Sequence, residues 1–272
     1  MMTDAARQAA RDVQASPLVR ALARGGYAAS GVVHVLIGLL VLSLAFGGSG
    51  EADQSGALRA IAGAPLGLLA LWVIAVVLGA LALYHLVEGV VLRSGPGAKG
   101  SAKAWGRRLS ELGQGVIFGA LGAVAASAAL GAHLNGNETA KAASRGVLSL
   151  PGGPVLLGAV GLGVAGGGVA FGVMGMLRSF EKKKTIPRDG LGPFVKGLGV
   201  VGYLAKGVAL TIVGVLLVIA AVTADPSQAG GLDAAFDALH AVTLGPVIVA
   251  AVGVGFVAYG VFLFFRARYA RL

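Results

Sequence analysis

Three related octapeptides, GVVHVLIG (31–38), GVIFGALG (115–122) and GVALTIVG (207–214), recur along the chain inside long apolar segments. In each, the first glycine is followed by a second glycine after seven residues and by an alanine after seven more. The small residues of this pattern are Gly31, Gly38 and Ala45; Gly115, Gly122 and Ala129; and Gly207, Gly214 and Ala221. Seven residues are nearly two turns of an α-helix, so each set lines one helix face and predicts close helix packing in a membrane.

Six apolar segments are long enough to cross a hydrocarbon core of about 30 Å, which needs about 20 residues. They are residues 27–46, 66–92, 112–131, 152–177, 198–222 and 244–265. We assign residues 1–24 to an N-terminal segment, and residues 25–93, 94–178 and 179–272 to three tandem two-helix repeats. Repeats with an even number of spans all share one orientation, so we expect a pseudo-threefold arrangement about the membrane normal. The predicted fold class is an all-α integral membrane protein.

The three connections between the two spans of a repeat also resemble one another. Each contains a short helix-like stretch, at residues 55–62, 139–148 and 232–241, and each stretch is followed by a glycine/proline turn. Aspartate often caps the N-terminus of a helix, so Asp233 is a candidate N-cap. We therefore expect a short interfacial helix in every external connection.

The composition fits a membrane protein. The chain is 56% apolar and only 12% charged, about half the charged fraction of soluble domains. Its 46 glycines lie largely within the apolar runs, which favours tight helix packing over flexible linkers. The absence of cysteine excludes disulfides, thiolate metal sites and cysteine nucleophiles. The polar residues 1–24 lack the apolar core of a signal peptide.

The basic residues predict the orientation of the chain. All 22 lysines and arginines but four lie in the N-terminal segment, the second and fourth connections and the C-terminus; the exceptions are Arg59, Lys141, Arg145 and Lys206. By the positive-inside rule, we expect both termini to lie in the cytoplasm. The predicted location is the plasma membrane of a bacterium, which the chain crosses several times. This distribution accounts for the net charge of +10 without a nucleic-acid partner.

The stretches ADPSQAGGLDAAFDALHAVTLGP (224–246) and AYGVFLFFRARYARL (258–272) resemble the third repeat of the DUF1206 family. The helix starts GGYAASGV (25–32) and VGYLAKGV (201–208) resemble the opening of its repeats. The family comprises actinobacterial membrane proteins of unknown function, so the resemblance implies six helices in three repeats and no established activity. Where the family pattern has arginine before the repeat glycine, this chain has Ser30, Gln114 and Lys206.

Ionisable residues at membrane depth are candidates for function, because a lipid environment makes them costly. The candidates are His34, His85, Glu88 and Lys206, and Ser30 and Gln114 are their neutral companions. Ser30, Gln114 and Lys206 hold equivalent positions in the three repeats, so we expect them at one level.

The two histidines allow three interpretations. His34 and His85 each lie about 10 Å from the cytoplasmic end of their predicted span, and the two spans form one predicted hairpin. Glu88 follows His85 by three residues, on the same helix face, and would fix its tautomer. The pair would bind haem, handle protons, or form hydrogen bonds with neighbouring backbone and serine groups inside the bundle.

Lys206 allows two interpretations. Its long stem would carry the ammonium to the cytoplasmic interface, or the ammonium would face the interior of the bundle. In the second case it would bind an anionic headgroup or pair with Glu88.

No pattern of paired carboxylates or metal ligands predicts an enzyme or a metal site. The polar residues at repeat-equivalent positions lead us to predict binding or permeation of a lipid or lipophilic small molecule between the hairpins. A structural or accessory subunit acting through a membrane-protein partner is the alternative. A haem-binding redox protein that uses His34 and His85 is the second alternative.

Overall fold

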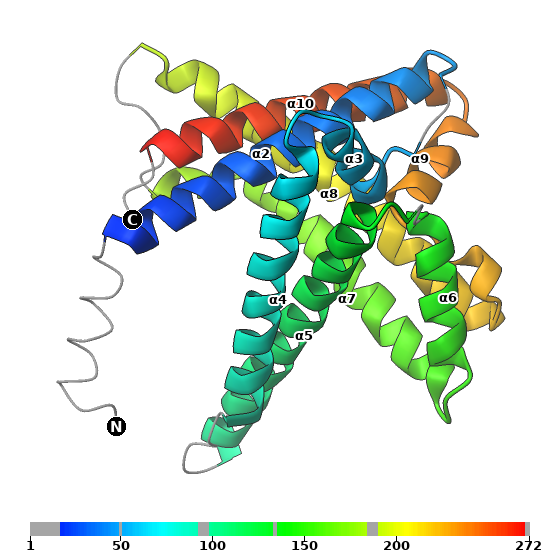
Figure 1. The fold of residues 1–272 in the computed structure, drawn as a ribbon. Helices are drawn as coiled ribbons and strands as arrows, with labels where there is room; N and C mark the ends of the chain where they lie inside the picture. Colours follow the sequence, from blue (N-terminus) through cyan, green and yellow to red (C-terminus); the bar gives the residue numbers. More distant parts are fainter. Residues whose placement is uncertain (1–16, 49–50, 92–97, 133–134, 184–189, 270–272) are drawn as a thin grey trace. The chain divides into compact units, whose positions relative to one another are not determined.

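In the computed structural model, the described residues are 17–48, 51–91, 98–132, 135–183 and 190–269. They form helices α2 (Pro17–Ala45), α3 (Gln54–Ala62), α4 (Gly67–Val91), α5 (Ala98–Ala129), α6 (Gly136–Leu148), α7 (Gly153–Met176), η1 (Ser179–Lys183), α8 (Gly192–Thr223), η2 (Pro226–Gln228), α9 (Leu232–His240) and α10 (Gly245–Tyr269). This part of the chain contains no strand (Figure 1). Most of the predicted N-terminal segment, residues 1–16, lies outside it.

Helices α2, α4, α5, α7, α8 and α10 are long and apolar enough to cross a membrane. The predicted six spans are therefore confirmed, as are the short helices α3, α6 and α9 in the connections between them. Helices α2, α5 and α8 begin earlier than predicted. Their first turns carry polar or charged residues, so the apolar window marks only the part of each helix that can lie in lipid.

The chain forms two compact units. Unit 1 comprises residues 1–57 and 135–272, and unit 2 comprises residues 58–134. Within unit 1, α7 packs along α8, α10 packs along α2, and α10 also contacts α8. Within unit 2, α4 packs along α5. The second span of each repeat thus packs along the first span of the next repeat, and the last span packs along the first.

These pairs join spans of different repeats, and within unit 1 the two spans of the third repeat, α8 and α10, are also in contact, as the sequence suggested. The physical reason for the pairing across repeats lies in the small residues that the paired helices present to each other. In the α10–α2 pair, a Cβ atom at Gly31 would lie 2.9 Å from the carbonyl oxygen of Gly260. A Cβ at Gly38 would lie 2.8 Å from the carbonyl oxygen of Gly253. No side chain fits at these approaches, which suit Cα–H···O contacts.

The other pairs repeat this arrangement. In the α7–α8 pair, a Cβ at Gly207 would lie 2.8 Å from the carbonyl oxygen of Gly168. In unit 2, a Cβ at Gly115 would lie 2.7 Å from Cγ of Leu86, and one at Gly122 would lie 3.4 Å from the carbonyl oxygen of Ala75. The glycine faces of α5 and α8 therefore meet the preceding span, and the glycine face of α2 meets the last span, α10. The accompanying Ala45 and Ala221 are buried, and Ala129 packs against the buried cluster of unit 2.

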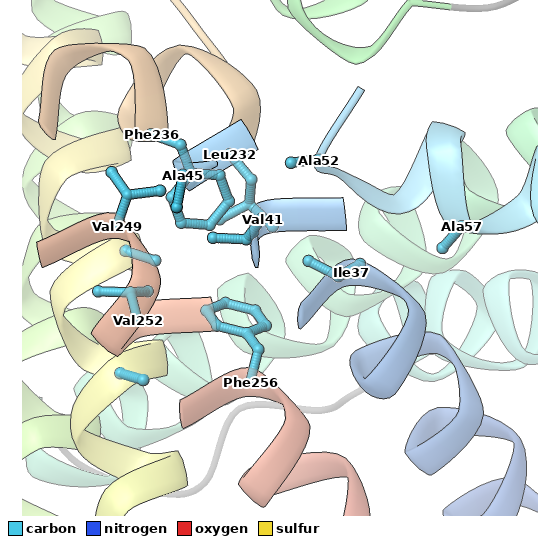
Figure 2. Close-up of a cluster of buried hydrophobic side chains, with 12 residues drawn as sticks. Ile37, Val41, Ala45, Ala52, Ala57, Leu232, Phe236, Val249, Val252 and Phe256 are labelled. Carbon is cyan, nitrogen blue, oxygen red and sulfur yellow. The ribbon is translucent and has the colours of Figure 1, made fainter. Parts of the chain in front are cut away.

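A buried apolar cluster holds α2, α9 and α10 together in unit 1 (Figure 2). Val252 and Phe256 of α10 lie in one cluster with Ile37 of α2, and Phe236 of α9 belongs to the same cluster. Phe236 and Ile37 are each 1% exposed. This packing fixes the rotation of α2 about its axis and so determines the direction of His34, which lies one turn before Ile37.

Within unit 1, a polar network joins residues of three connections between spans. The carboxylate of Asp233 accepts hydrogen bonds from the backbone N–H of Ala52 and from Nδ2 of Asn137, both at 3.1 Å. Oδ1 of Asn137 accepts from the backbone N–H groups of Gly231 (3.0 Å) and Ala234 (3.1 Å). The N-cap of α9 is Gly231, so the prediction that Asp233 caps this helix is wrong. Asn137 satisfies the free N–H groups of α9 instead, from the start of α6.

Candidate functional site

His34 and Lys206 meet inside unit 1. Nε2 of His34 lies 3.3 Å from Nζ of Lys206, although the two residues are 172 positions apart. Nδ1 of His34 lies 2.7 Å from the carbonyl oxygen of Ser30, one helical turn earlier in α2. The Ser30 hydroxyl is 3.4 Å from the same nitrogen. Three of the predicted site residues are therefore in contact.

Aromatic rings surround this contact. Nζ of Lys206 lies 5.1 Å from the ring centroid of Phe171 in α7 and 4.9 Å from that of Tyr259 in α10. The His34 ring stands edge-on to Tyr259 at 4.9 Å and stacks on Phe256 at 6.0 Å. Each distance to Lys206 is short enough for a cation–π interaction. We refer to Ser30, His34, Phe171, Lys206 and Tyr259 as the Lys206 centre.

Lys206 does not extend toward an end of its helix. It lies near the middle of α8, and its ammonium points to the α2 histidine and the two rings. Because the side chain is held between α2, α7 and α10, the interpretation in which the stem carries the charge to the interface does not describe this structure. The ammonium faces the interior of unit 1.

The charge of Lys206 has no acidic partner in the described part of the chain. The ion pairs of unit 1 there join Lys141 to Glu138 and Lys196 to Glu181. A second cation, Arg266, lies two turns beyond Tyr259 in α10, with its Cζ 4.6 Å from the ring of Tyr27. Lys206 thus carries its charge in a membrane-spanning region, where an unpaired charge is costly.

Unit 2 has its own polar cluster, built from α4 and α5. Nδ1 of His85 lies 2.7 Å from Oε2 of Glu111, and the His85 ring stacks on Phe118 at 5.3 Å. Glu88 accepts a hydrogen bond from Nη2 of Arg107 at 3.3 Å. The prediction that Glu88 orients His85 is therefore wrong. Glu111 reaches the His85 ring from the neighbouring helix α5. Glu88 lies beside His85 on α4, and its carboxylate pairs with Arg107 instead.

Gln114 also belongs to unit 2. Its side-chain amide donates to the carbonyl oxygen and to Oγ of Ser110, both at 3.3 Å. Of the three repeat-equivalent positions, Ser30 and Lys206 therefore flank His34 in unit 1, and Gln114 forms hydrogen bonds within its own helix.

The partners that the sequence interpretation missed are Phe171, Tyr259 and Glu111. Tyr259 lies in the stretch that resembles the family's last helix, and Phe171 is the single aromatic residue in the glycine-rich α7. Phe171 could have been identified as the one aromatic ring of α7, whereas Tyr259 lies among several phenylalanines of α10. Glu111 lies just before the apolar window that begins at residue 112, so a search restricted to that window excludes it.

The haem hypothesis for His34 stays a prediction. Nδ1 faces the Ser30 carbonyl, so an iron would be held through Nε2, and this would require Lys206, 3.3 Å from that nitrogen, to move. Among the described residues, no group of three or more histidines, aspartates or glutamates could hold a metal ion.

Six membrane-crossing helices in three two-helix repeats define a multi-pass membrane protein. The model of a family described as Domain of Unknown Function (DUF1206) matches residues 25–91, 110–178 and 201–270, once in each repeat. The chain belongs to this family, so the resemblance inferred from its third repeat is confirmed.

A relative from Bacillus subtilis (strain 168), called "Uncharacterized protein YxxB", is 24% identical over 261 residues. The match covers 95% of this chain and 94% of the relative. No solved structure matches the chain.

Proposed function

We propose that the protein binds an anionic lipid, or another lipophilic oxyanion, at the Lys206 centre between the α7–α8 and α10–α2 pairs. One observation carries the proposal. The Lys206 ammonium has a histidine and two aromatic rings as neighbours, and no carboxylate pairs with it in the described part of the chain. An oxyanion would supply the missing counter-charge through charge-assisted hydrogen bonds.

The geometry of the ammonium supports this ligand class. An ammonium group has three donors and no acceptor. One donor of Lys206 is directed at Nε2 of His34, which leaves two for oxygen acceptors. The apolar walls formed by Phe171 and Tyr259 suit the acyl chains or ring systems of a lipophilic ligand.

We also propose that the protein lies in the plasma membrane with both termini in the cytoplasm. The support is the distribution of lysine and arginine, which is heavily biased to one side of the six spans. In this orientation Arg266 lies toward the cytoplasm from Lys206.

The binding proposal is tested by titrating the purified protein with phosphatidylglycerol and with phosphatidylcholine of the same acyl chains. Native mass spectrometry measures occupancy. Both headgroups are phosphodiesters, and only the first is anionic overall. We expect tighter binding of phosphatidylglycerol, weakened by roughly tenfold or more in Lys206→Met, because that variant loses a charge-assisted hydrogen bond.

Lys196→Met is the matched control, because Lys196 is on the same helix but is half exposed and ion-paired with Glu181. It tests general attraction of basic side chains to anionic lipid. Equal binding of the two lipids, or equal loss in the two variants, would contradict the proposal. Binding of a stoichiometric protein partner without any lipid preference would favour the accessory-subunit alternative.

A further inference from the structure

The hydrogen bonds of His34 determine where its proton lies. A carbonyl oxygen can only accept, so the contact of 2.7 Å between Nδ1 and the Ser30 carbonyl requires a proton on Nδ1. The ring is thereby held with Nε2 facing Lys206. This nitrogen then has a lone pair available whenever the imidazole is neutral.

The contact with Lys206 completes this assignment. An ammonium has no lone pair, so Lys206 donates to Nε2, and Nε2 must be unprotonated. A proton on both atoms would place two cations 3.3 Å apart with no acceptor between them. The Lys206–His34 pair therefore holds a single excess proton, and one positive charge, in the described structure.

The surroundings offer no counter-charge for a second proton. The titratable or charged groups of the described part that face the pair or its aromatic walls are Tyr27 on α2, Tyr203 and Lys206 on α8, and Tyr259 and Arg266 on α10. The tyrosines are neutral near pH 7 and the other groups are cations. From α7, the residue that faces Lys206 is Phe171, whose ring is apolar.

We propose that binding of an oxyanion at the Lys206 centre is coupled to uptake of one proton by His34. The proton comes from solvent and adds to Nε2, and the hydrogen bond from Lys206 to Nε2 is lost. Both Lys206 and the imidazolium then donate to oxygens of the bound anion. This inference rests on the proposed function, since it names the regulation of the same site.

The coupling has a definite sign. A bound anion stabilises the doubly protonated pair, so binding is tighter at a pH where a histidine can be charged. An ordinary histidine titrates near pH 6.5. Affinity for the anion therefore falls as the pH rises from 6 to 9, approaching a tenfold loss per pH unit over the steepest part.

The experiment is isothermal titration calorimetry of the full chain with a short-chain phosphatidylglycerol. Its phosphodiester keeps one negative charge across this pH range. Titrations in two buffers of different ionisation enthalpy give the number of protons taken up. We expect proton uptake on binding at pH 6, at most one proton per anion, and almost none at pH 9. A second arm with inorganic phosphate distinguishes a headgroup that needs its acyl chains from a free phosphate.

Two variants assign the proton. His34→Gln keeps a polar side chain but cannot be charged, so we expect binding with no proton uptake. His85→Gln is the control, and we expect it to take up the same proton as wild type. Circular dichroism verifies that each variant is folded.

The outcomes separate the two proposals. Wild-type binding of phosphatidylglycerol without proton uptake would overturn the coupling and leave the binding proposal standing. Proton uptake that persists in folded His34→Gln would overturn the assignment to His34. Failure of wild type to bind either anion would overturn both.

Discussion

Nε2 of His34 in the first repeat lies 3.3 Å from Nζ of Lys206 in the third. Two of the three repeats therefore share one polar centre, and the contact joins α2 of one helix pair to α8 of another. The equivalent positions of His34 in the other repeats are Phe118 and Leu210, which have no titratable group. The proposed site therefore lies where the sequences of the three repeats differ from one another.

The glycine faces predict a position-specific cost for a larger side chain. Gly207→Leu places a side chain against Gly168 and Gly172 of α7, where a Cβ alone would approach backbone atoms to 2.7–2.8 Å. Overpacking of this kind costs about 1–3 kcal/mol, so we expect a clear fall in the thermal unfolding midpoint in detergent. Gly197→Leu is the control on the same helix, because nothing lies within 4 Å of its Cβ position. Equal effects of the two substitutions would contradict the α7–α8 pairing.

The proposed orientation of the chain in the membrane predicts which segments a membrane-impermeant reagent can reach. The chain has no cysteine, so a single introduced cysteine reports its own accessibility. In intact cells, a membrane-impermeant maleimide should label Lys141→Cys in α6 and should label Lys196→Cys in α8 only after lysis. The reverse pattern would place both termini outside the cell.

Asp53 predicts a pH-dependent stability of unit 1. Burial, with Asp233 nearby, raises the pKa of this carboxyl above its usual value of 3.8. The folded state therefore favours the protonated form, and the contribution of Asp53 to stability declines as the pH rises through the folded-state pKa. Asp53→Asn keeps an oxygen that can accept from the Gly56 N–H, which lies 3.0 Å from Oδ1 in the native chain.

We accordingly expect Asp53→Asn to raise the thermal midpoint at pH 7 by roughly 2–4 °C, with the difference shrinking as the pH approaches 4. Asp225→Asn is the comparison, because hydrogen bonds from Ser227 lower the pKa of that exposed carboxyl. A destabilised Asp53→Asn at pH 7 would show that the buried carboxylate is required in its charged form.

The two glutamates of unit 2 should differ in their effect on stability. Glu111 holds Nδ1 of His85 at 2.7 Å with both side chains 16% exposed, whereas Glu88 pairs with an Arg107 that is 61% exposed. We expect Glu111→Gln to cost about 1.5–3 kcal/mol and Glu88→Gln less than about 1 kcal/mol. Thermal unfolding of the two variants measures this, and a larger loss in Glu88→Gln would restore Glu88 as the partner of His85.

The six spans and the short helices between them could be predicted because they depend on local properties. Hydropathy over about 20 residues identifies a span, and the pattern of residues 232–241 alone predicts the short helix α9. The choice of helix partners depends on contacts between distant segments, which the hydropathy of a single segment does not indicate. The seven-residue spacing of Gly161, Gly168 and Gly175 in α7, and of Gly253 and Gly260 in α10, was available as a signal of the facing surfaces.

The site could be predicted only in part for the same reason. Membrane depth singled out His34 and Lys206, but nothing near either residue indicates that they touch. Glu88 was assigned to His85 because a residue three positions away shares its helix face. The structure instead brings Glu111 from α5, whose position depends on how α4 and α5 pack.

The most direct test of the binding proposal is mass spectrometry of the lipids that remain bound to the protein purified in mild detergent from its native membrane. Wild type should retain an anionic lipid enriched over its share of the membrane, and Lys206→Met should lose that enrichment while Lys196→Met keeps it. Retained lipids that match the bulk membrane composition in all three proteins would contradict the role assigned to Lys206.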